Sequence, residues 1–184
     1  MQHATAERQL FAANGFSATS IDAIAAQARV TKGAVYHHFA SKQELFRAVY
    51  LTIESEVEAA SGAAAAKGRS AIDAILRGVD AYLDAAMSGD VQRITLVDAP
   101  AVLGPHPNGD PDDNPGHVGL RTVISEAIAA GSVKPIDPDS LAHLIRGGCL
   151  QAAILIALSK TQRATRKKVG DTLRALIQGL ELVP

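Results

Sequence analysis

Three helix starts follow one another in the short stretch from Thr19 to Phe46, and they constrain the fold more than any other feature of the sequence. Thr19 precedes Asp22 by three residues, and Ser41 precedes Glu44 by the same interval. This spacing predicts capped helix starts, because the hydroxyl can accept a bond from a first-turn amide while the acid favours the positive end of the helix. We therefore expect short helices in close succession.

The middle start, at Thr31, has a different composition. Lys32 and Gly33 follow it, and Ala34 stands where the other two starts have an acid. An open, small and cationic helix N-terminus favours a phosphate group. The apolar residues around it are spaced so that two short helices can pack across a tight turn: Ile21, Ile24, Ala25, Ala28, Val30, Val35 and Phe39. This pattern predicts a helix-turn-helix whose second helix, Lys32 to Phe39, enters DNA.

Four motifs of this region resemble, in order and spacing, the DNA-binding domain of TetR-family transcriptional repressors: Gly15 to Ser20 (GxxxTS), Ile24-Ala25, Val30 to Phe39 (VxKGxxYxHF) and Ser41 to Leu45. The resemblance implies an all-α, TetR-like fold. Its parts would be an N-terminal three-helix helix-turn-helix domain, residues 1–46, and a C-terminal helical ligand-binding and dimerisation domain, residues 47–184. The sequence departs from the family pattern at Arg29, since the turn usually carries a glycine that accepts a left-handed backbone.

The resemblance also implies which residues contact DNA. Thr31, Tyr36 and Lys42 match positions that contact phosphates, and Lys32, Gly33, Ala34 and His37 match positions that approach bases or the DNA backbone. A glycine and an alanine at a helix start permit close approach, while an imidazole or a phenol can form hydrogen bonds with a phosphate or a base edge. The alternative for Tyr36 is a packing role within the three-helix domain.

Charge and composition agree with an intracellular DNA-binding protein. Residues 1–50 contain five Lys/Arg and three Asp/Glu, and the remainder contains thirteen and sixteen, so the net charge is +2 in the first part and −3 in the second. The basic part carries the DNA motif. The single cysteine excludes an internal disulfide, and the longest apolar run, Cys149 to Leu158, is short for a membrane span. We expect a cytoplasmic protein.

Apolar periodicity predicts helices through the rest of the chain: Thr5 to Asn14, Ser41 to about Ala60, Ser70 to Ala86, Val91 to Leu103 bent at Pro100, His117 to Ala130, Ser140 to Leu158 and Thr165 to Leu182. The last two have more apolar surface than one small domain can cover. We expect them to form a homodimer interface, as the resemblance also implies. Gly147-Gly148 suits the close approach of a second subunit or a ligand.

A small, largely apolar effector is expected in the second domain, where it would release the DNA. The resemblance supplies this expectation, and the apolar, aromatic-poor helices supply a place for a pocket with a few polar groups. The candidate ligand-binding residues are Tyr82, Met87, His143, Arg146, Cys149 and Gln151.

Other classes of function have weaker support. His106, His117, Asp110, Asp112 and Asp113 lie in or next to the loop from Gly104 to Gly116, but their spacing matches no closed zinc pattern, so we expect no metal ion. Cys149 near His143 and Arg146 could be a nucleophile, although a small core residue is favoured. Catalytic motifs are absent, so we expect neither an enzyme nor a cofactor. A ligand-binding or scaffolding module that has lost DNA binding is the alternative, favoured by Arg29 and a short N-terminal arm.

Overall fold

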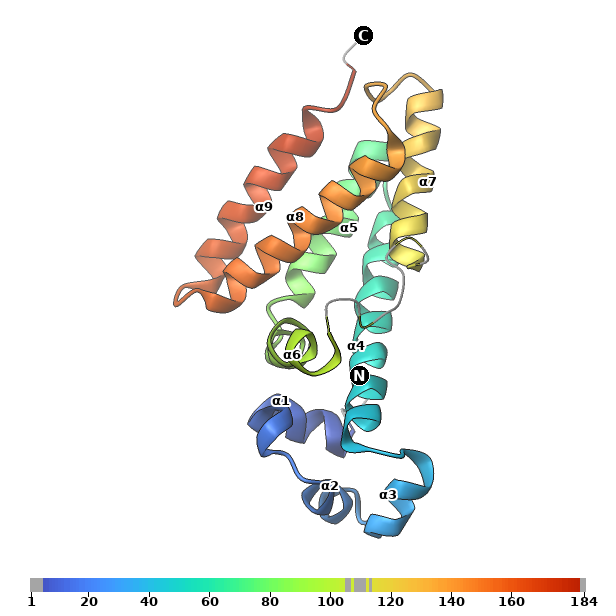
Figure 1. Cartoon of the computed structure of the whole chain (residues 1–184). Coiled ribbons are helices and arrows are strands. Elements are labelled where there is room, and N and C mark those ends of the chain that lie inside the picture. Colours follow the sequence, from blue (N-terminus) through green and yellow to red (C-terminus); the bar gives the residue numbers. More distant parts are fainter. Residues whose placement is uncertain (1–4, 105–106, 108–111, 113, 183–184) are drawn as a thin grey trace. The chain divides into compact units, whose positions relative to one another are not determined.

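The computed structural model describes residues 5–104, 107, 112 and 114–182, and the described residues are almost entirely helical (Figure 1). The all-α prediction is confirmed. The chain divides into two compact units, one formed by residues 1–55 with 88–107 and the other by residues 56–87 with 108–184. In chain order the helices are α1 Ala6–Ala18, α2 Ile21–Ala28, α3 Lys32–His38, α4 Lys42–Ala65, α5 Ala71–Ala85, the π-helix η1 Val91–Asp98, α6 Ala99–Leu103, α7 Pro115–Ala129, α8 Pro138–Leu158 and α9 Gln162–Gln178.

Aromatic side chains hold the first unit together. The Phe46 ring of α4 meets Phe11 and Phe16 of α1 edge-on, with ring centroids 5.0 and 5.1 Å apart. Such pairs contribute about 0.5–1.5 kcal/mol each beyond the apolar area that they bury. Leu45, Val49 and Ile53, which recur every four residues along α4, are buried as their spacing predicts.

The segment 88–107 belongs to this first unit although it follows α5 in the chain. Arg8 of α1 forms an ion pair with Asp90, and the Phe16 N–H donates to Asp98 over 2.7 Å. Gly15 has φ 77°, a backbone that residues with a Cβ rarely adopt, so the turn itself favours glycine; the nearest atoms to a Cβ there belong to the end of the flexible Arg93 side chain, which could move aside. The helix predicted to end at Asn14 is instead kinked at Gly15 and continues to Ala18.

The predicted helix from Val91 to Leu103 is a π-helix followed by a short α-helix. Pro100 is the second residue of α6, which follows η1 directly. Near the proline where the sequence predicts a bend, the structure changes from π-helix to α-helix, between Asp98 and Ala99. Val97 is half exposed, so the segment is buried on one side only.

Several residues of the helix-turn-helix differ from their predicted roles. Ser20, not Thr19, caps α2 by accepting the Ala23 N–H, while Thr19 is buried and donates its hydroxyl proton to the Gly15 carbonyl. The Thr31 cap and the Ser41 cap are confirmed, and Glu44 bonds the Ala40 N–H. Of the predicted core residues, Ile21, Ile24, Ala25 and Val35 are buried, whereas Ala28 and Val30 are exposed and Phe39 is half-buried, because α2 and α3 are short and meet on one side only.

Arg29 has the left-handed backbone that glycine usually provides, with φ 57° and ψ 39°. Its N–H bonds the Ala26 carbonyl, and the Val30 N–H bonds the Ala25 carbonyl. These two bonds form a Schellman motif that ends α2 and turns the chain into α3. A residue with a Cβ is strained in this conformation by about 1–2 kcal/mol.

Replacing Arg29 with glycine is expected to raise the free energy of unfolding by about 1 kcal/mol, because relief of the backbone strain exceeds the greater freedom of glycine in the unfolded chain. Urea unfolding of the full chain measures the change. Arg29→Ala is the matched control, since it removes the guanidinium and keeps the Cβ. If Arg29→Ala raises the free energy of unfolding as much as Arg29→Gly does, then loss of the guanidinium, and not relief of backbone strain, causes the stabilisation.

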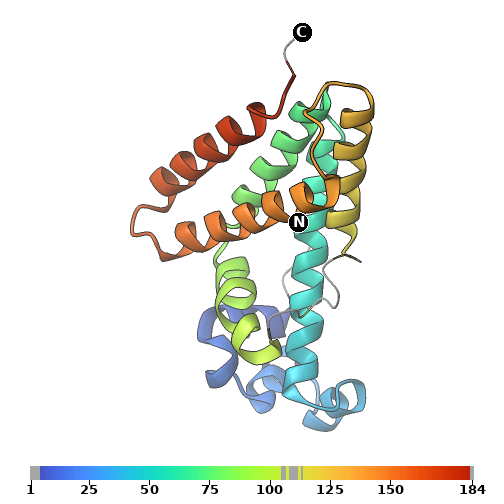
Figure 2. The same cartoon turned by 45° about the horizontal axis from the view of Figure 1, so that its top comes forward.

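In the second unit, α5, α7, α8 and α9 surround one apolar core. Five apolar residues at helical spacing along α5 are buried, as this spacing predicts: Ile72, Ile75, Leu76, Val79 and Leu83. Ion pairs hold α9 to α5, since Arg166 bonds both Asp80 and Asp84 and Arg174 also pairs with Asp80. The helices α8 and α9 run side by side in both ribbon views (Figures 1 and 2).

Candidate nucleic-acid interface

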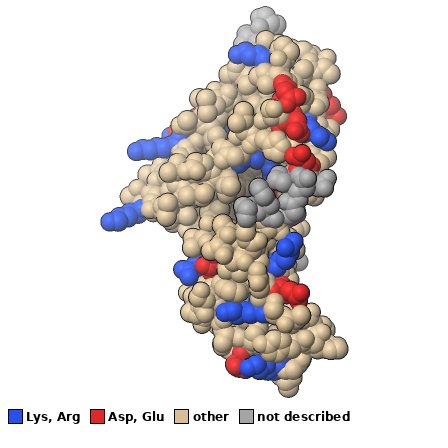
Figure 3. Space-filling view, in the orientation of Figure 1, with Lys and Arg blue, Asp and Glu red and all other residues tan. Residues whose placement is uncertain are grey.

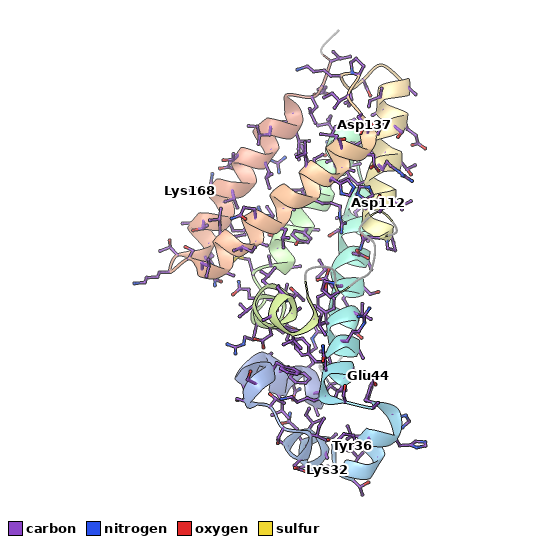
Figure 4. The ribbon with its side chains drawn as sticks, viewed as in Figure 1. Lys32, Tyr36, Glu44, Asp112, Asp137 and Lys168 are labelled. Atoms are coloured by element: carbon purple, nitrogen blue, oxygen red, sulfur yellow. The ribbon has the colours of Figure 1, made fainter. Side chains whose placement is uncertain are left out.

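The surface of α3 carries most of the residues predicted to contact DNA. Thr31, Lys32, Gly33, Tyr36 and His37 are all exposed, and Ala34 is half-buried. Lys32 and Tyr36 lie at the same end of the first unit (Figure 4). Tyr36 exposes 48% of its surface, so packing within the unit does not account for the whole phenol side chain.

Gly33 has no packing role within the described residues. A Cβ at this position would meet nothing closer than the Thr31 hydroxyl oxygen, 3.8 Å away, and the backbone has no positive φ. The chain itself would therefore accept alanine or a larger residue, which would be the better helix former. A glycine in this place suits a surface that another molecule approaches closely.

Asp22 of α2 forms an ion pair with Lys32 of α3, with the Lys32 ammonium 3.0 Å from the carboxylate. The hydrogen bond from Lys32 to Asp22 raises the pKa of the Lys32 ammonium above its usual value, so the ammonium is cationic at neutral pH. The sequence did not indicate this contact, because the two residues lie ten positions apart in different helices. A phosphate that binds Lys32 must compete with this carboxylate.

Lys42, at the start of α4, is only partly available. Its ammonium donates to the carbonyls of Phe16 and Thr19 over 2.9 and 3.0 Å, and it lies 4.2 Å from the centre of the Phe16 ring. These contacts tie α4 to the end of α1. An ammonium has three donors, so one N–H remains for a phosphate.

This geometry defines a class of protein: a helix-turn-helix unit with a polar, partly cationic recognition helix, joined to a separate helical unit. Comparisons with known proteins agree. Residues 5–49 match the family described as bacterial regulatory proteins, tetR family, and residues 72–180 match the tetracyclin repressor-like C-terminal domain. The second match alone covers more than half of the chain. The chain belongs to the TetR family of transcriptional regulators, and DNA binding is the activity of the family's N-terminal unit.

Individual relatives extend this match along the whole chain. The transposon Tn10 TetC protein of Escherichia coli is 29% identical over 151 residues, which cover 80% of this chain and 74% of that protein. The crystal structure of a TetR-family regulator from Pectobacterium atrosepticum is 33% identical, covers 97% of this chain and 92% of its own, and has a TM-score of 0.83. The FadR regulator of Bacillus subtilis, solved in complex with stearoyl-CoA, is 16% identical with a TM-score of 0.72 over 94% of each chain, and it shows the fold alone.

The six residues predicted to bind a ligand lie in different surroundings within the second unit. Cys149 is buried, and Tyr82 and Met87 pack against the same core. Met87 also lines a shallow, open depression with residues 160–164 at the start of α9. His143 and Gln151 are exposed and Arg146 is half-buried, with its guanidinium 4.0 Å from Glu58. The structure therefore does not gather the six around one cavity, and their role in ligand binding stays a prediction.

The Cys149 thiol is expected to be unreactive at neutral pH, because burial raises its pKa to about 11. The folded state's preference for the protonated thiol is fully present below pH 9 and is lost as the pH rises through about 11. Stability should therefore fall across this interval. Urea unfolding at several pH values would measure the fall, and Cys149→Ala should lack it. Rapid alkylation of the folded protein at pH 7 would contradict this environment.

An apolar strip of α8 is left uncovered within the chain. Leu144 and Leu158 expose 73% and 78% of their surfaces, and Leu155 exposes about half. Gly147 lies on the same face, and a Cβ there would meet no atom within 4 Å. The surface over α8 is largely uncharged in Figure 3. By length and composition α8 could also cross a membrane, a test that core helices of other proteins pass too.

Proposed function

We propose that this chain is a dimeric transcriptional repressor that binds a pseudo-palindromic operator and is released from it by a small, largely apolar ligand. The exposed α3 surface with its unfilled space at Gly33 is the observation that carries the DNA-binding part. The proposed contacts are Thr31, Tyr36 and Lys42 to phosphates and Lys32, Gly33, Ala34 and His37 to bases or the DNA backbone. We place this activity in the cytoplasm.

Two copies are needed because one short recognition helix covers few base pairs. The uncovered strip of α8, together with Leu176 of α9, which exposes 66% of its surface, supports a dimer through the last two helices. In such a dimer the two recognition helices meet half-sites about one helical turn, or a multiple of it, apart.

Titration of labelled DNA from the protein's own upstream region, followed by fluorescence anisotropy, tests the proposal. A specific, saturable complex with two chains per DNA is expected, with affinity that falls as salt rises because phosphate contacts release counterions. Binding that is no tighter than binding to unrelated DNA of the same length would support the alternative, a helical module without operator recognition.

The ligand part of the proposal has a separate test. The FadR regulator of Bacillus subtilis shares this fold and was solved with stearoyl-CoA, so a fold of this kind can hold a ligand with a long apolar chain. A ligand can release DNA only through a difference in its affinity for the two states of the protein. We therefore expect a co-purified or screened ligand to bind free protein more tightly than operator-bound protein, and operator binding to weaken by the same factor. Unequal factors would exclude a simple linkage between the sites.

A further inference from the structure

Two histidines and two aspartates of the second unit converge on one point. Asp112 precedes α7, His117 lies in the first turn of α7, and Asp139 and His143 lie one turn apart on α8. Each offers a ligand atom, and all four atoms lie within 4.8 Å of one another. Asp112 is labelled beside α7 in Figure 4. The sequence pattern missed this cluster because it brings three separate segments together.

The contacts within the cluster are short. His117 Nε2 lies 3.0 Å from an Asp139 oxygen, and His143 Nε2 lies 2.9 Å from an Asp112 oxygen and 3.7 Å from the other Asp139 oxygen. The two imidazole rings are 4.1 Å apart at their centroids. Metal–ligand distances of about 2.0–2.2 Å place the atoms of a tetrahedral site about 3.4 Å from one another. The four side chains therefore need only small rotations to share one ion.

His117 has polar capacity that the protein itself does not use. Its side chain is completely buried, and its Nδ1 has no hydrogen-bond partner among the described residues. An unsatisfied buried polar atom costs about 1–3 kcal/mol. The backbone fixes this histidine in place, because Asn114 caps α7 by accepting the His117 N–H. Asn114 in turn donates to Glu58.

The donor set selects a class of ion. Two imidazole nitrogens and two carboxylate oxygens suit Zn²⁺ and its first-row neighbours, whereas Mg²⁺ and Ca²⁺ prefer oxygen ligands alone. Two carboxylates also neutralise a divalent charge. Arg121 is a nearby cation that opposes binding, but its guanidinium is 3.5 Å from Asp139 and half exposed, so it can turn toward solvent.

We propose that Asp112, His117, Asp139 and His143 form a binding site for one divalent first-row transition-metal ion, with Zn²⁺ as its natural probe. This goes against the expectation of no metal site, which rested on residues of the loop; three of those residues, His106, Asp110 and Asp113, lie outside the described part of the chain. The ion would fasten the starts of α7 and α8 to Asp112, which lies three residues before the first residue of α7. DNA takes no part in it, and His143 is its one residue that also belongs to the six candidate effector-binding residues.

The test is calorimetric titration of Zn²⁺ into the full-length, tag-free protein after treatment with a chelator, with no DNA present. We expect one ion per chain and a higher melting temperature with Zn²⁺. His143→Ala and Asp112→Asn each remove an exposed ligand and should weaken binding by about 100-fold or more. Mg²⁺ in excess should not compete. Circular dichroism confirms that each variant is folded.

The matched controls remove the same side-chain types from exposed positions elsewhere. His38→Ala in α3 and Asp171→Asn in α9 should bind Zn²⁺ as the unaltered protein does. The proposal is overturned if the unaltered chain binds Zn²⁺ no more tightly than His143→Ala, or if the controls lose as much affinity as the ligand variants. Because these readouts involve the free protein, their failure leaves operator binding untouched.

Discussion

Replacement of both Leu144 and Leu155 by arginine is expected to yield monomers and to weaken operator binding strongly. Both side chains lie on the uncovered strip of α8, with Gly147 between them, so neither contributes to the core of its own chain. Two charges on each copy would meet their equivalents across a dimer interface without partners. Loss of the second recognition helix removes avidity, which should weaken operator binding by about 100-fold or more.

Sedimentation velocity measures the oligomeric state, and anisotropy measures operator affinity. Val118→Arg, on an exposed position of α7, is the matched control and should leave a DNA-binding dimer. Ala153 and Ile154 also lie in the helix predicted to form the interface, but Ala153 is completely buried in its own chain and Ile154 is half-buried, so arginine at either position would disturb the core. A double variant that remains a dimer would place the interface elsewhere.

Gly33→Leu is expected to stabilise the first unit and to weaken operator binding by about ten- to a hundredfold. The chain leaves space for the new side chain, and leucine favours the helix over glycine by about 0.5–1 kcal/mol. The same side chain would occupy the space between α3 and a closely approaching DNA, where lost or displaced contacts cost about 1–3 kcal/mol. Stability and function should therefore change in opposite directions.

Gly62→Leu is the matched control for this variant. Gly62 lies in α4 and is exposed, and a Cβ there would meet no atom within 4 Å, so leucine should stabilise the helix and leave operator binding unchanged. Urea unfolding measures the stability of each variant, and fluorescence anisotropy measures its operator affinity. If Gly33→Leu binds the operator as tightly as the unaltered protein, α3 does not contact DNA closely at this position.

Local sequence spacing predicted the positions of the helices well. It did not predict the N-cap of α2, where either of two adjacent residues could act as the cap. Ser41 and Glu44 cap α4 as predicted, because no other hydroxyl competes in that turn. At the start of α2, Thr19 and Ser20 are both suitable caps. The choice depends on the Leu10 and Gly15 carbonyls, which accept the Thr19 hydroxyl within the folded unit. Such a partner is invisible to local sequence spacing.

The two candidate sites, the α3 surface and the histidine–aspartate cluster, differ in how far local sequence signals predict them. The α3 surface could be predicted because its residues are consecutive and their order is that of a known motif. The histidine–aspartate cluster has one local signal, the four-residue spacing of Asp139 and His143, and this spacing is common on helices. Its other half, Asp112 and His117, joins it only through the packing of α7 against α8.

The discontinuity of the first unit has a consequence for the nascent chain. Arg8 and Phe16 find their partners in Asp90 and Asp98, so the unit cannot close when residue 55 leaves the ribosome. Synthesis of the intervening residues up to 107 takes about 3–10 s at about 5–20 residues per second. The helix α5 is completed within this interval, and the α1 surface that η1 will cover stays exposed to other proteins in the cell until η1 has been made. The order of the segments along the chain thus delays the completion of the first unit, although its first four helices begin to be made before any other. The unit that carries α3 is complete only after α5, which belongs to the second unit, has been synthesised.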